Sequence, residues 1–90
     1  MAGVALVAFL KARPDVKTIQ QRFGEVLRRR REAAGLSQEA LAAQADLHRN
    51  YVGLLERAQM TPSLTVVEKL AAALGVTMTK LIADIEKLAD

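Results

Sequence analysis

The stretch GLSQEALAAQADLHRNYVGLLER, residues 35–57, decides the fold of this chain. It predicts two short helices joined by a tight turn. Ser37 is a good N-cap for the first helix, and the second helix is expected to run from about His48 to Arg57. Asp46 and Leu47 form the turn between them. Apolar residues recur at helical spacing, so both helices are expected to face a common core. The inward-facing residues are Leu41, Ala42, Ala45, Val52 and Leu55.

The outer face of the second helix is polar. A small basic protein needs this arrangement to place one helix in the major groove of DNA. The chain has 90 residues and a net charge of +3, and its length indicates one domain. The basic excess lies within residues 1–60, whereas residues 61–90 carry one more acidic than basic side chain. This distribution gives mild support for a polyanionic partner.

Three further helices are expected around this two-helix unit, in an all-α, compact five-helix bundle that covers residues 18–90. The chain is rich in Ala, Leu and Val and holds only three aromatic residues, which favours helices over strands. Capping residues open the three helices, and glycines end two of them. The residues at these boundaries are Thr18 with Gln21, Gly35, Ser63, Gly75 and Thr77.

Residues 1–17 are expected to form an N-terminal arm outside this domain, because Pro14 disfavours a helical conformation at the residue before it. The arm is either a loosely ordered terminus or an accessory segment that packs on a partner subunit. The second alternative would use Val4, Leu6, Val7 and Leu10. The apolar run of residues 2–10 is too short to span a bilayer and lacks the features of a secretory signal.

Several classes of chemistry lack their residues in this sequence. There is no Cys, which suits a reducing cytoplasm, and the lone His48 has no acidic cluster around it to complete a metal site. No nucleophile stands beside a base, and no phosphate-binding loop occurs. We therefore expect no catalysis, no metal and no cofactor.

Four landmarks occur in order along the chain: G-L-S-Q-E-x-L-A, Y-V-x-x-L-E-R, P-S-L and A-x-A-L-G-V. With their spacing, they resemble the Xre/Cro-type helix-turn-helix family, the lambda-repressor-like DNA-binding domains, over about residues 19–85. The resemblance implies a five-helix bundle, found mostly in bacterial and phage transcription regulators that bind operators as dimers. The segment from Leu47 to Tyr51, followed by Leu55 to Arg57, is similar to controller proteins of restriction–modification systems.

The family pattern places Arg49 and Asn50 at positions that reach base edges, on the first exposed turn of the second helix. Arg can bond guanine through O6 and N7, and Asn can bond adenine in the same two-point manner. The alternative for both is an ordinary solvated surface. Gly53 would let the helix backbone approach the DNA. Leu54 would touch either a thymine methyl group or, as the alternative, a partner subunit or the core.

Further DNA contacts are implied by the same resemblance. Gln38, at the start of the first helix of the unit, is expected to hold a phosphate and brace the second helix. The remaining candidates each have a plain surface, capping or packing role as their alternative. These candidates are His48, Tyr51, Arg57 and Ser63.

Two structural roles follow from the family as well. Arg31 and Glu56 match a buried ion pair that links the first helix of the bundle to the end of the helix near 48–57. The last helix is expected to form the dimer interface, with capping of the monomer core as the alternative. Its apolar residues are Leu81, Ile82, Ile85 and Leu88.

The chain departs from the family pattern at four positions. Asp46 stands where Gly is usual in the turn, and it can adopt the left-handed conformation less readily than Gly. Ala58 also replaces a usual Gly, so the helix ending near Arg57 is expected to be longer or less sharply turned. His48 replaces the usual Ser or Thr, which puts its helix cap in doubt. Arg30 replaces an aliphatic residue, and its guanidinium is expected to reach water.

These observations predict a sequence-specific transcriptional regulator, a repressor or a dual regulator. It would bind a pseudo-palindromic operator in double-stranded DNA as a homodimer. We expect it in the cytoplasm, associated with the bacterial nucleoid, with no membrane and no small-molecule effector. The alternative is an antitoxin or another protein-interaction module with secondary DNA binding, which would use residues 1–17 or the last helix.

Overall fold

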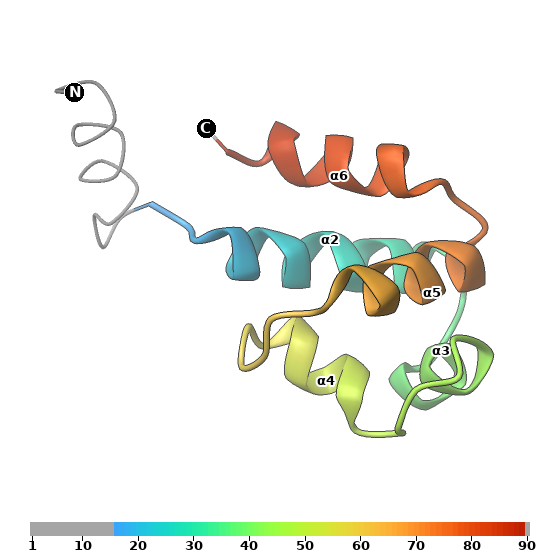
Figure 1. The fold of residues 1–90 in the computed structure, drawn as a ribbon. Helices are drawn as coiled ribbons and strands as arrows, with labels where there is room; N and C mark the ends of the chain where they lie inside the picture. Colours follow the sequence, from blue (N-terminus) through green and yellow to red (C-terminus); the bar gives the residue numbers. More distant parts are fainter. Residues whose placement is uncertain (1–15, 90) are drawn as a thin grey trace, which may run out of the picture.

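The computed structural model describes residues 16–89, so nearly all of the predicted N-terminal arm lies outside the described residues. In that part of the chain the structure is all-helical with five helices, as predicted (Figure 1). The helices are α2 (Ile19–Ala33), α3 (Gln38–Gln44), α4 (Tyr51–Glu56), α5 (Leu64–Leu74) and α6 (Met78–Lys87).

Side-chain caps open four of the helices, as the sequence predicts. Thr18 and Gln21 form a complete capping box at the start of α2. The hydroxyl groups of the other three N-cap residues each accept a hydrogen bond from a backbone N–H three residues on, which satisfies one of the unpaired donors of the first turn. These residues are Ser37, Ser63 and Thr77.

Helix α4 is shorter than predicted, because it begins at Tyr51 rather than near His48. The three residues before it form a separate turn. The Tyr51 N–H donates to the His48 carbonyl at 2.9 Å, and the Asn50 N–H donates to His48 Nδ1 at 3.2 Å. His48 thus holds this turn through its ring nitrogen, in the place of the usual Ser or Thr cap.

Asp46 and Ala58 both adopt the left-handed conformation, with φ of 55° and 57°. At each position the next residue donates its N–H five residues back, from Leu47 to Ala42 at 2.8 Å and from Gln59 to Leu54 at 2.9 Å. This is the pattern of a Schellman helix end. The expectation of a longer or less sharply turned end at Ala58 is therefore wrong: the turn is as sharp as with glycine, with a Cβ present.

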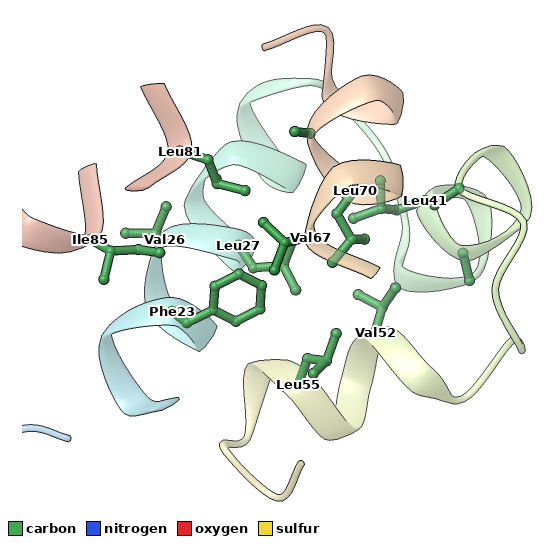
Figure 2. Packing of buried hydrophobic residues seen from close by; sticks show 13 residues of the cluster. Phe23, Val26, Leu27, Leu41, Val52, Leu55, Val67, Leu70, Leu81 and Ile85 are labelled. Atoms are coloured by element: carbon green, nitrogen blue, oxygen red, sulfur yellow. The ribbon is translucent and has the colours of Figure 1, made fainter. Parts of the chain in front are cut away.

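The core lies where α2 crosses the other helices. Helix α2 packs on α4 and α6, while α3 packs on α4 and α5. The side chains from these helices meet in one cluster (Figure 2). Seven of them have no exposed surface: Leu27, Leu41, Ala42, Val52, Leu55, Leu70 and Leu81. Within residues 16–89, no helix is long and apolar enough to cross a membrane.

Candidate nucleic-acid interface

An ion pair between Arg31 and Glu56 ties α2 to the end of α4. Arg31 Nε donates to Glu56 Oε2 at 2.6 Å, and Nη2 donates to Oε1 at 3.1 Å. The two side chains are 12% and 5% exposed, and the bond to Glu56 raises the pKa of Arg31. Arg31 Nη1 also donates to the Leu36 carbonyl at 2.9 Å, just before α3. One guanidinium therefore holds three segments in place.

Gln38 joins the same group of side chains. Its Nε2 donates to Glu56 Oε1 at 3.0 Å, so the first residue of α3 is tied to the last residue of α4. This contact agrees with the bracing role that the resemblance implies. Because the amide is only partly buried, the other amide hydrogen stays available to a ligand.

Gly53 is buried beneath side chains, where the sequence predicted a bare backbone lying against DNA. A Cβ at this position would stand 3.1 Å from Gln38 Oε1 and 3.0 Å from Arg57 Nη1. The glycine therefore makes room for these two side chains to cross α4.

Arg49 and Asn50 lie in the turn before α4 rather than on its first turn. Both are exposed, as is His48, and none of them belongs to the core. Arg49 Nη2 lies 3.4 Å from Oε1 of Glu39 on α3. No sequence motif indicated a role for Glu39, which directly follows Gln38.

The other proposed contact residues differ in their exposure and in the hydrogen bonds that they already make. Tyr51 is half-buried and packs against the core, and Leu54 is half-buried. Arg57 is exposed, and its Nε donates to Gln59 Oε1 at 3.2 Å. The Ser63 hydroxyl accepts from the Val66 N–H, so it already serves as a helix cap.

The last helix contributes to the core more than the sequence predicted. Leu81 has no exposed surface and Ile85 is 3% exposed. The prediction that these two residues lie in a surface interface is therefore wrong. Leu88 is partly buried against the same cluster. Of the four predicted interface residues, Ile82 alone is exposed, at 41%.

Arg30 also behaves differently from the prediction. Its Nε donates to Asp84 Oδ2 on α6 at 2.8 Å, so its guanidinium is paired rather than solvated. This bond, with a weaker contribution from Lys80, holds the pKa of Asp84 below its usual value. The pair replaces the contact that an aliphatic residue would make between α2 and α6.

Exposed apolar side chains lie at Ile82, at Ile19 on α2 (58% exposed) and at Leu64 on α5 (78% exposed). Ile19 and Ile82 line one groove together with Pro62 and Val67. The helical spacing of Ile19 with Phe23 and Leu27 favours the buried face of α2, yet the structure leaves Ile19 exposed. Among the described residues, no group of His, Asp or Glu could hold a metal ion.

Comparison with known proteins identifies the family. Residues 27–81 match the family model described as Helix-turn-helix. The chain therefore belongs to the helix-turn-helix family of DNA-binding regulators, as the four sequence landmarks indicated.

Within that family, the chain is similar to control proteins. Control protein C.MunI from a Mycoplasma species is 46% identical over 70 residues, which are 77% of this chain and 95% of that protein. Control protein C.BamHI from Bacillus amyloliquefaciens is 44% identical over 55 residues, 60% of this chain and 68% of that one. The crystal structure of the restriction-modification controller protein C.AhdI from Aeromonas hydrophila gives a TM-score of 0.67 at 47% identity. The match covers 69% of this chain and 94% of that structure.

Proposed function

We propose that this chain is a sequence-specific transcriptional regulator that binds a pseudo-palindromic operator as a homodimer. One observation carries the proposal: Arg49 and Asn50 are exposed and have no core role, and they lie in the turn between α3 and α4, two helices joined by a hydrogen-bonded frame. Gln38 and Glu56 form that frame across α3 and α4. Side chains that read bases need such support, because a two-point bond to a base edge tolerates little misplacement.

Contacts to the phosphate backbone would come from the residues that flank this pair. Gln38 has an amide hydrogen left for a phosphate oxygen, and Arg57 is exposed at the end of α4. His48 and Tyr51 flank the base-reading residues on either side. Such contacts set the register on the duplex, while Arg49 and Asn50 supply the selectivity.

The homodimer would form through exposed apolar side chains on three helices. We call Ile19, Leu64 and Ile82 together the apolar surface. A two-fold interface is self-complementary, so one such patch on each chain suffices. In Figure 1, α6 and α4 lie on opposite sides of α2, so contacts through α6 leave α4 free. Two copies would then present two recognition turns to half-sites about 34 Å apart.

The similarity to C.MunI and C.AhdI further suggests that the regulated genes belong to a restriction–modification system. The proposal assigns the chain no catalytic activity and no effector, so regulation would follow the amount of protein. Its place of action is the bacterial cytoplasm, on the DNA.

Selection of bound duplexes from a random pool tests the proposal. We expect an enriched pseudo-palindrome, bound by two chains, with an affinity that falls steeply as salt rises. Sedimentation of the protein–DNA complex gives the stoichiometry. Enrichment of no sequence would contradict the proposal, as would an affinity that is independent of salt and sequence.

A further inference from the structure

A carboxylate stands inside the surface that the proposed function assigns to DNA. Glu39 follows Gln38 in the first turn of α3, and its side chain is 70% exposed. Its Oε1 lies 3.4 Å from Nη2 of Arg49. A negative charge next to a phosphate-binding side chain opposes binding to any duplex, so it needs a reason.

The stability of the fold does not explain why a carboxylate stands at position 39. Among the contacts of residues 16–89, the exposed pair with Arg49 is the only charged contact that Glu39 makes. Pairs of this kind contribute little to folding. The start of α3 favours an acidic side chain, but an uncharged residue there would serve nearly as well.

The two partners of the pair suggest a different role. The Arg49 guanidinium has five N–H donors, and guanine offers O6 and N7 as paired acceptors. Arg49 can therefore bond a guanine edge through two donors and keep a third directed at Glu39. A guanidinium that turns to a phosphate instead leaves the Glu39 carboxylate unneutralised beside the negative backbone.

We propose that Glu39 is a specificity-determining residue, which holds Arg49 in position for a guanine edge and penalises its use as a general phosphate ligand. The inference rests on the proposed function. Under this proposal, the Glu39 carboxylate lowers the affinity for unrelated DNA. It lowers the affinity for the operator much less. Glu39 thus raises the ratio of operator affinity to unrelated-DNA affinity.

A double-mutant cycle with Glu39→Gln and Arg49→Ala tests the proposal. Affinities are measured for the selected operator and for a scrambled duplex of the same length, at several salt concentrations. We expect Glu39→Gln to bind the scrambled duplex roughly three- to tenfold more tightly, with a smaller change for the operator. In the Arg49→Ala background the substitution should no longer lower the operator-to-scrambled ratio.

Glu68→Gln is the matched control, because it removes the same charge from an exposed position on α5. If Glu68→Gln lowers the ratio as much as Glu39→Gln does, the effect is one of net charge, and the proposal is overturned. The proposal is also overturned if Glu39→Gln changes the operator-to-scrambled ratio equally in the presence of Arg49 and in the Arg49→Ala background. If the unaltered chain selects no sequence, the proposed function itself fails, which is a distinct result.

Discussion

Gln38 donates to Oε1 of Glu56 at 3.0 Å, and this bond joins the first residue of α3 to the last residue of α4. The same oxygen accepts from Arg31 Nη2, so α2 is bound into the same group. The relative placement of the three helices therefore depends on one buried carboxylate. This arrangement holds the turn with Arg49 and Asn50 at a fixed position beside α3.

Removing the charge of Glu56 should be strongly destabilising. Glu56→Gln leaves the Arg31 guanidinium in a mostly buried site with no carboxylate, and breaking such a pair costs about 3–5 kcal/mol. The free energy of unfolding, measured by urea denaturation, gives the size of the loss. Lys17→Ala, which breaks the exposed pair with Glu25, is the control and should cost much less than Glu56→Gln. Equal losses for the two variants would show that Glu56 has no special structural role.

Ala58→Gly should stabilise the protein. The left-handed conformation at Ala58 costs a residue with a Cβ about 1–2 kcal/mol, and glycine avoids this cost. The greater freedom of glycine in the unfolded chain offsets part of the gain, so we expect a net increase of about 0.5–1 kcal/mol. Thermal unfolding followed by circular dichroism measures it. Ala43→Gly, within helix α3, should instead lower stability by a similar amount. A loss of stability in Ala58→Gly would mean that the Ala58 methyl group makes a contact that outweighs the strain.

The sequence predicted most of the fold because its signals are local. Capping residues such as Thr18 and Ser63 act within one turn of their own helix, so they are visible without knowledge of the partner helices. The errors about which side chains of α2 and α6 are buried concern contacts between helices that are distant in the sequence. Whether Ile19 or Ile85 faces the core depends on how α2 and α6 cross, and helical spacing alone does not determine that crossing.

The site was predictable to a similar extent. The family resemblance predicted the Arg31–Glu56 pair, which the structure confirms. It also singled out Gln38, whose contact with DNA stays a prediction. The partner of Arg49 was not visible, because Glu39 is ten residues away and on another helix. The start of α4 was misplaced because His48 accepts the Asn50 N–H through a ring nitrogen, a cap that residue preferences do not signal.

The Arg30–Asp84 pair should make stability depend on acid pH. The pKa of Asp84 is lower in the folded chain than its ordinary value, so the unfolded state binds a proton more readily. The stabilisation is thus fully present above the unfolded pKa and is lost as pH falls through the folded pKa. Asp84→Asn should remove this contribution, and its unfolding free energy should fall less between neutral and acid pH than that of the unaltered chain. Parallel profiles for the two proteins would exclude a role for Asp84.

Arg49→Ala should strongly reduce selectivity for the operator while leaving stability nearly unchanged. Arg49 is exposed, and within the described chain its charged contact is the weak pair with Glu39. Loss of a two-point bond to guanine removes about 1–3 kcal/mol of discrimination at each half-site. Competition between operator and scrambled duplexes measures the loss, and a melting curve measures stability. A large drop in melting temperature would instead make Arg49 a structural residue.

Charged substitutions on the apolar surface should dissociate the homodimer. Ile82→Lys combined with Leu64→Lys places unpaired ammonium groups where the two copies would meet, and each is costly to bury. We expect a folded monomer by analytical ultracentrifugation, with operator affinity reduced because each half-site is then bound alone. Thr79→Lys, an exposed position on α6 outside the apolar surface, is the control and should remain a dimer. Leu81→Ala should act differently, by lowering stability by about 2–5 kcal/mol through a cavity in the core of each chain. A double-lysine variant that stays dimeric would place the interface on another face of the molecule.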